Sequence, residues 1–143
     1  MDRKQEFSEG DDVRISEGTE TILLVEDDEV VRKLVREVLD NEGYRLLEAP
    51  NGVAALSICA QYEEPIHLLL TDVVMPEMSG RELANRLAAV RPEVKVLYMS
   101  GYTDDVVLRS GVLAESSSFL QKPFTSAGLG IKIREVLAGP QLH

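Results

Sequence analysis

The chain has 143 residues, of which 44% are hydrophobic and 28% are charged, a balance typical of a globular protein with one sizeable core. Its formal net charge of −10 opposes nonspecific binding to nucleic acid or to an anionic membrane surface, so we expect neither as a partner. The sequence has one cysteine, no signal peptide and no apolar run long enough to span a membrane, so we expect a cytoplasmic protein without disulfides.

Strands and helices are predicted to alternate along residues 20–139. Short apolar runs predict strands at residues 21–25, 44–48, 67–71, 95–99 and 118–121. Apolar residues at helical spacing predict helices around residues 31–39, 53–60, 79–91, 103–111 and 125–138. Alternation with short connections favours a doubly wound, five-stranded parallel sheet with five helices. The polar residues 1–19 are expected to be a flexible leader or linker, and residues 140–143 a short tail.

Five residues carry local structural signals. Gly43 suits the left-handed position that ends a helix, and Ser79 with Glu82 forms the pattern of a capping box. Cys59 lies among small apolar residues of a predicted helix, so we interpret it as a buried structural thiol. His67 begins a predicted strand without a second ligand at metal-binding spacing, and we interpret it as structural too.

Three carboxylates are predicted to meet at one edge of the sheet. Glu26 and Asp27 follow the first strand, and Asp72 ends the third. With strand order 2-1-3-4-5 the chain leaves these neighbouring strands in opposite directions, which opens a crevice between their carboxyl ends. Acids gathered there repel unless a cation holds them, and a set of oxygen ligands favours Mg²⁺. The backbone carbonyl of Val74 could supply a further ligand; alternatively, the acids only solvate the strand ends.

Two more polar residues follow the neighbouring strands. Ser100 comes after the fourth strand and Lys122 after the fifth, so both are predicted to face the same crevice. Phosphoryl transfer needs a nucleophile, a metal ion and donors to the phosphoryl oxygens. Asp72, Mg²⁺, Ser100 and Lys122 match those parts. The Lys122–Pro123 bond is a candidate cis peptide.

Together, these residues resemble the receiver domain of two-component response regulators over about residues 20–138. The matching motifs, in chain order, are Glu26-Asp27, Asp72-Val73-Val74-Met75-Pro76-Glu77-Met78-Ser79-Gly80, Ser100-Gly101 and Lys122-Pro123-Phe124. The resemblance implies a flavodoxin-like receiver fold and a signalling phosphoacceptor rather than an enzyme. Two departures preserve the chemistry: Glu26 stands where Asp is more common, and Ser100 where Thr is frequent.

The resemblance also implies the direction of phosphoryl transfer. Asp72 would accept the group from a phosphohistidine on a sensor histidine kinase or a histidine phosphotransfer protein. Glu26, Asp27 and the Val74 carbonyl would position Mg²⁺. Asp28 is a further acid beside this set.

The remaining implied roles concern the response to phosphorylation. Lys122 would contact the phosphoryl group, and Ser100 would move to hydrogen-bond it. Phe119 falls at the family's switch aromatic, with a buried core Phe as the alternative. A downstream protein would bind the face of the fourth helix, fifth strand and fifth helix of a monomer or weak dimer. Slow self-hydrolysis is expected, because Val74 cannot orient water and Tyr102 shields the phosphoryl group.

Three rivals differ in chemistry. A phosphatase of the haloacid dehalogenase type needs a second Asp two residues after the nucleophile, where this chain has Val74. An FMN-binding flavodoxin needs a phosphate loop after the first strand, where the acids at 26–28 repel phosphate. The third rival is a receiver kept only for docking. Residues 73–80 and 119–124 resemble receivers of hybrid sensor kinases, so the chain fits either a free-standing regulator or part of such a kinase.

Overall fold

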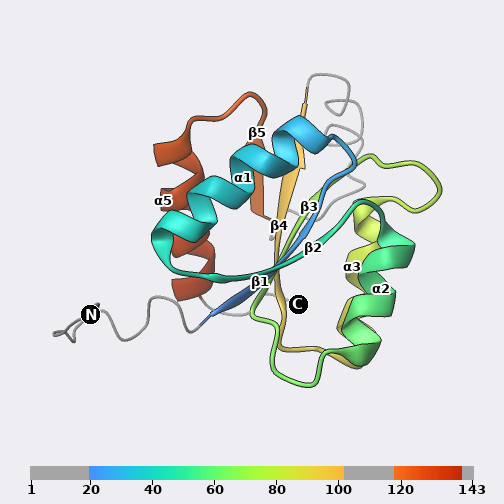
Figure 1. Cartoon of the computed structure of the whole chain (residues 1–143). Coiled ribbons are helices and arrows are strands. Elements are labelled where there is room, and N and C mark those ends of the chain that lie inside the picture. The colour runs from blue at the N-terminus through green and yellow to red at the C-terminus, as the bar shows by residue number, and fades with distance from the viewer. Residues whose placement is uncertain (1–19, 102–117, 140–143) are drawn as a thin grey trace, which may run out of the picture.

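A computed structural model describes residues 20–101 and 118–139, which form an α/β structure with one parallel sheet (Figure 1). The strand order is β2-β1-β3-β4-β5, as predicted. The strands are β1 (Thr21–Val25), β2 (Arg45–Ala49), β3 (Leu68–Asp72), β4 (Lys95–Ser100) and β5 (Ser118–Gln121). The helices in these ranges are α1 (Glu29–Glu42), α2 (Gly52–Gln61), α3 (Gly80–Val90) and α5 (Ser126–Ala138). The predicted leader, tail and helix around 103–111 lie outside the described ranges.

Helices cover both faces of the sheet, with α1 and α5 on one side and α2 and α3 on the other (Figure 1). The alternation of β1 shows how: Ile22 and Leu24 point toward α1 and α5, whereas Leu23 and Val25 point toward α2 and α3. All four are fully buried. A strand buried on both faces has no solvent-facing side, which is why β1 is apolar throughout residues 22–25.

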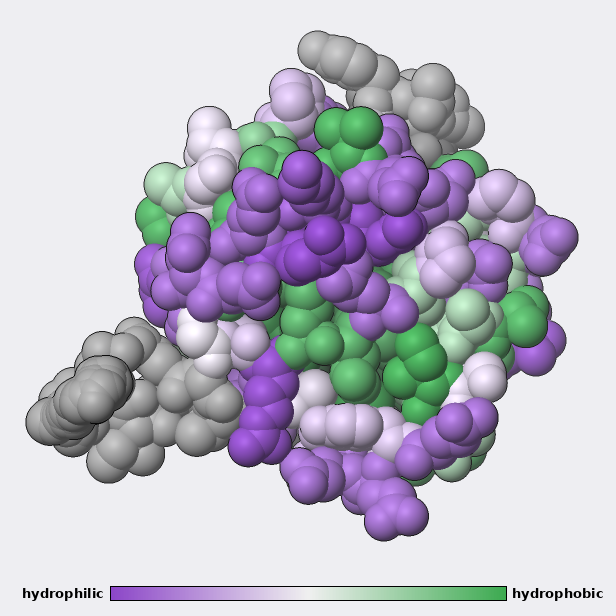
Figure 2. All heavy atoms as spheres, in the orientation of Figure 1, coloured by the Kyte–Doolittle hydropathy of each residue, from purple (hydrophilic) through white to green (hydrophobic). Residues whose placement is uncertain are grey.

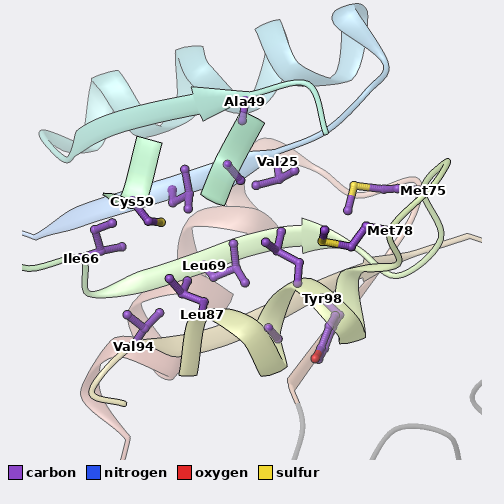
Figure 3. Close-up of a cluster of buried hydrophobic side chains, with 14 of the residues drawn as sticks. Val25, Ala49, Cys59, Ile66, Leu69, Met75, Met78, Leu87, Val94 and Tyr98 are labelled. Carbon is purple, nitrogen blue, oxygen red and sulfur yellow. The ribbon is translucent and has the colours of Figure 1, made fainter. Parts of the chain in front are cut away.

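The outer surface differs from this core. Figure 2 shows hydrophilic side chains over α1 and a hydrophobic area over the neighbouring edge strand β2, whose Leu46 and Leu47 are half-buried. Cys59 is a buried residue of α2 whose side chain packs in the core (Figure 3), as its apolar neighbours indicated. Within the described ranges, no helix is both long enough and apolar enough to cross a membrane.

The helix ends confirm one capping prediction and half of another. Gly43 ends α1 in the left-handed region, with φ of 88°. Ser79 Oγ accepts a hydrogen bond from the Glu82 N–H at 3.1 Å, which is the first half of the predicted capping box. The Glu82 carboxylate instead accepts from Arg86 at 2.8 Å, because a residue four positions on along a helix lies within its reach.

Two strand boundaries differ from the prediction in a way that matters for the site. β3 and β4 each extend one residue further, to Asp72 and Ser100. Asp72 pairs in register with Met99, and Ser100 with Gln121. The polar residues that end these strands are therefore held by the sheet itself.

Candidate functional site

Three acidic side chains lie together at the carboxyl edge of β1 and β3. One carboxylate oxygen from each of Glu26, Asp27 and Asp72 lies within 4.8 Å of the others. Glu26 and Asp72 are 1% and 5% exposed, respectively, whereas Asp27 is exposed. The convergence predicted from strand order is therefore present in the structure, with two of its acids buried.

Lys122 places its ammonium group against the two buried acids. Its Nζ lies 2.6 Å from Asp72 Oδ1 and 3.1 Å from Glu26 Oε1. The Lys122 N–H donates to the Ser100 carbonyl at 2.7 Å, which ties the residue after β5 to the end of β4. The Lys122–Pro123 peptide bond is cis. Strands 1, 3 and 5 thus deliver their charged residues to one place.

Burial and proximity change how these groups hold protons. Burial, followed by contacts with Glu26, raises the pKa of Asp72 to about 8, against the opposing effect of Lys122. Burial also favours a higher pKa for Glu26, but hydrogen bonds with Asp72, the Asp28 N–H and Lys122 outweigh it and lower that pKa. Glu26 is therefore ionised at neutral pH, while Asp72 retains a proton that a bound cation has to displace.

Burial acts on Lys122 in the opposite direction. It favours a lower pKa for the ammonium group, but the contacts with Asp72 and Glu26 outweigh it, and the pKa of Lys122 is raised. Lys122 therefore stays charged at neutral pH and can act as a fixed cation beside the acids.

The loop after β3 is packed closely against Asp72. A Cβ atom at Gly80 would lie 1.9 Å from the Asp72 carbonyl oxygen, so only glycine fits there. Met75 and Met78 are buried and point into the core beneath α2 and α3 (Figure 3). Val74, in contrast, has a side chain that is 56% exposed. The loop is anchored by its methionines and carries Val74 outward beside the acids.

Ser100 and Phe119 belong to the neighbouring strands. Ser100 is 1% exposed at the end of β4. Two residues earlier on the same face, Tyr98 stacks on Phe119, with ring centroids 5.6 Å apart and an interplanar angle of 29°. Phe119 is half-buried and packs against the core, so its ring is a core contact that still reaches solvent. Tyr102 lies outside the described ranges.

Asp28 has a structural role beside the site. Its carboxylate caps α1 by accepting hydrogen bonds from the N–H groups of Val30 and Val31 at 2.9 and 3.3 Å. Its own N–H donates to Glu26 Oε2 at 3.0 Å. Asp28 thus orients Glu26 while its own side chain serves the helix end.

A second cation at this edge, Arg32, was not predicted from the sequence. Arg32 Nη1 donates to the backbone carbonyl of Glu26 at 2.7 Å, and its Nε lies 3.5 Å from Glu48 Oε1. The spacing of Arg32 and Arg36 indicates only that they share a side of α1. Their acidic partner, Glu48, lies on strand β2, so no local pattern reveals the contact.

A doubly wound sheet with clustered acids and a lysine at its carboxyl edge is the arrangement of a phosphoacceptor signalling domain. The chain belongs to the response regulator receiver domain family, whose model matches residues 22–134. It is therefore a receiver domain of two-component signal transduction, and the cluster of Glu26, Asp27 and Asp72 fits the family's phosphoacceptor site.

Similar proteins include both large and small members of this family. The chain is 37% identical to the sensor kinase CckA of Brucella abortus, over 84% of this chain and 13% of the kinase. It is 35% identical to the response regulator receiver protein CpdR of the same organism, over 81% of this chain and 95% of CpdR. A crystal structure of the receiver domain from the hybrid histidine kinase CckA matches with 29% identity and a TM-score of 0.68, covering 82% and 98% of the two chains.

Proposed function

We propose that Asp72 is the phosphoacceptor and that its phosphoryl group comes from a phosphohistidine on a sensor histidine kinase or a histidine phosphotransfer protein. A carboxylate oxygen of Asp72 attacks phosphorus, the P–N bond breaks, and the imidazole leaves with the bonding electrons and takes up a proton. The observation that carries this proposal is the burial of Asp72 at the sheet edge with Lys122 Nζ 2.6 Å away.

Glu26, Asp27, Asp72 and the Val74 carbonyl would hold a Mg²⁺ ion. Their donors are all oxygens, and burial together with the neighbouring Glu26 carboxylate raises the pKa of Asp72. Both features suit a hard divalent cation. When bound, Mg²⁺ supplies charge neutralisation at the phosphoryl oxygens and favours the ionised form of Asp72.

Lys122 and Ser100 supply the remaining contacts to the phosphoryl group. Phosphorylation converts an Asp72 carboxylate oxygen into the bridging oxygen of an acyl phosphate, so the Lys122 ammonium can turn to a phosphoryl oxygen. Ser100, at the end of the adjacent strand, donates a hydrogen bond from its hydroxyl group to another phosphoryl oxygen. These contacts stabilise the added negative charge of about −1.5 to −2 on the phosphoryl group.

The movement of Ser100 would bias the output face. Tyr98 stacks on Phe119 one strand away, so a shift at the end of β4 is transmitted to a half-buried ring on β5. The downstream protein would bind the face formed by the predicted helix around 103–111, β5 and α5. A Ser100→Ala variant that keeps the full phosphorylation-dependent change in NMR signals on β5 and α5 would contradict this relay.

The phosphohistidine donor would dock beside the acids, on the start of α1. Val30 and Leu34 lie on successive turns of α1 and are 78% and 40% exposed. Val74, two residues after Asp72, adds a third exposed apolar side chain. An apolar rim of this kind suits a helical partner that has to present its histidine to a recessed carboxylate.

We further propose a phosphoacceptor without turnover of a separate substrate, monomeric or weakly dimeric, in the cytoplasm. Residues 20–139 would form the receiver, with residues 1–19 as a leader or linker, in a free-standing regulator or as part of a longer sensor kinase. Val74 stands where a phosphatase needs a second acid, and its apolar side chain cannot orient water. The lifetime of the phosphorylated form should therefore be far longer than seconds. The protein should also not hydrolyse phosphate monoesters.

The test is incubation with acetyl phosphate, with Mg²⁺ or with EDTA, followed by mass spectrometry of the intact protein. We expect one added phosphoryl group with Mg²⁺ and none with EDTA. Asp72→Asn is the matched control and should gain none. Wild-type protein that stays unmodified with Mg²⁺ would overturn the proposal and favour a receiver kept for docking.

A further inference from the structure

We propose that Arg32 is a positioning residue for the acidic site, one that fixes the turn carrying Glu26 and Asp27 and so tightens Mg²⁺ binding. This inference rests on the proposed function, because it concerns the same metal ligands. The Arg32 side chain contacts the backbone carbonyl of Glu26, one of the proposed metal ligands.

The contact lies where the chain leaves the sheet. The Glu26 N–H still donates to the Ala49 carbonyl at 3.2 Å, as the last bond between β1 and β2. The Glu26 carbonyl accepts a hydrogen bond from Arg32 Nη1 at 2.7 Å. Since the Glu26 carboxylate also accepts from the Asp28 N–H, the residue is held from both sides. Its side chain has little freedom to turn away from Asp72.

The guanidinium group of Arg32 is itself fixed. Its Nε lies 3.5 Å from Glu48 Oε1, and the Arg32 side chain is 18% exposed. Glu48 lies on β2, in register with Leu24 of β1. Arg32 therefore links α1, the end of β1 and the edge strand β2, which are the elements that define the position of the β1–α1 turn.

Charge and positioning predict opposite effects when Arg32 is removed. A positive charge near a cation site disfavours Mg²⁺, so the loss of charge alone would tighten binding. The loss of the contact to the Glu26 carbonyl would free the turn and weaken binding, as the loss of groups that orient metal ligands generally does. The sign of the change separates the two effects.

The experiment compares Arg32→Gln with Arg36→Gln. Arg36 lies one turn further along α1 and also binds Glu48, at 2.7 and 2.9 Å. Both variants remove one positive charge from the same helix, but only the first removes the bond to Glu26. The Mg²⁺ dissociation constant is measured by calorimetry, and amide signals of Asp27 and Asp28 are recorded by NMR in EDTA.

We expect Arg32→Gln to weaken Mg²⁺ binding by roughly tenfold and to shift both amide signals. Arg36→Gln should leave the dissociation constant within about twofold or lower it, because it removes the same charge but leaves the bond from Arg32 to the Glu26 carbonyl in place. Thermal unfolding checks that each variant is folded. If Arg32→Gln fails to fold, Arg32→Lys keeps the charge but loses the planar fork, and it should weaken binding in the same direction.

The failures are distinguishable. Wild-type protein that binds Mg²⁺, with an Arg32→Gln variant that binds as tightly or more tightly, would overturn the role of Arg32 and leave the proposed function standing. Wild-type protein that binds no Mg²⁺ would overturn the proposed function and the role of Arg32 with it.

Discussion

The two edges of the sheet use charged side chains in opposite ways. At the carboxyl edge, Glu26, Asp72 and Lys122 lie against one another with two of the three nearly inaccessible to solvent. At the amino edge, Lys95 and Arg91 instead donate to backbone carbonyls. Lys95 Nζ donates to the carbonyls of Leu137 and Gly139 at the end of α5.

Arg91 repeats the amino-edge arrangement on the other face of the sheet. Its guanidinium donates to the carbonyls of Glu64 at 2.8 Å and Cys59 at 3.1 Å, and also to that of Tyr62. The last carbonyls of a helix have no partner within it, so Arg91 satisfies acceptors that α2 leaves open. The amino edge therefore uses charge to stabilise the fold.

The charged residues of the amino edge serve stability, whereas those of the carboxyl edge serve the proposed site. Lys95 and Arg91 at the amino edge satisfy backbone carbonyls. At the carboxyl edge, Glu26 and Asp72 are buried so close together that Asp72 keeps a proton. Removing the former should lower stability without changing ligand binding. Changing the latter should alter the dependence of stability on Mg²⁺ and pH.

The largest expected effect is at the amino edge. Arg91→Ala should lower the free energy of unfolding by about 2 to 4 kcal/mol, because it leaves three carbonyls without their charged donor. Urea unfolding in EDTA measures this, and the Mg²⁺ dissociation constant should stay unchanged. Arg86→Ala, which removes an exposed pair with Glu82, is the control and should lose about 0.5 kcal/mol or less. A weakened affinity for Mg²⁺ in Arg91→Ala would break the separation of the edges.

The second effect belongs to the carboxyl edge. Mg²⁺ at a hundred times its dissociation constant should raise the free energy of unfolding of the wild type by about 2.7 kcal/mol. At the same concentration Asp72→Asn should gain clearly less, because it has lost a ligand and a charge, while Arg91→Ala should gain as much as the wild type. Thermal or urea unfolding with and without Mg²⁺ measures all three. Equal gains for wild type and Asp72→Asn would place the ion elsewhere.

The third effect is a pH dependence in EDTA. Because the pKa of Asp72 is raised to about 8, the folded state binds a proton that the unfolded state has already lost above about pH 4. The stability that this proton on Asp72 contributes is therefore fully present below the unfolded pKa of about 4, and it is lost as pH rises from there through 8. Relative to Asp72→Asn, the wild type should lose about 2.5 kcal/mol of stability between about pH 5.5 and 7.5. A constant difference between the two proteins over this range would show that Asp72 is ionised throughout.

Strand order and the residues at the strand ends were sufficient to predict the fold and the core of the site. β1 and β3 are buried on both faces, so their composition alone indicates central parallel strands. The order of the strands then brings Glu26 and Asp72 together without any information on side-chain contacts. His67 is structural, as predicted: its Nδ1 accepts a hydrogen bond from the Thr21 N–H at 2.9 Å.

The rest depends on contacts between residues distant in sequence. Arg91 binds carbonyls 27 to 32 positions away, and Lys95 binds Leu137, 42 positions away. No periodicity encodes such pairs, and the same limit applies to Arg32 with Glu48. The location of the proton between Glu26 and Asp72 depends on tenths of an ångström and on burial, which a pattern of residue types does not contain.

The smallest effect concerns backbone strain at the carboxyl edge. Glu77, in the loop after β3, has φ of 72° and an exposed side chain. A residue with a Cβ atom is disfavoured in this region by about 1 kcal/mol, whereas glycine adopts it freely. Glu77→Gly should therefore be more stable than Glu77→Ala by about 0.5 to 1 kcal/mol, even though glycine loses more entropy on folding. Elsewhere in the fold the same comparison favours alanine, as at Ala127 in the exposed first turn of α5, where Ala127→Gly should be destabilising. Urea unfolding of the three variants measures the contrast. A Glu77→Ala variant more stable than Glu77→Gly would mean that the loop beside Asp72 relaxes in solution and that residue 77 is not strained. The carboxyl edge would then differ from the amino edge in the use of its charges but not in backbone strain.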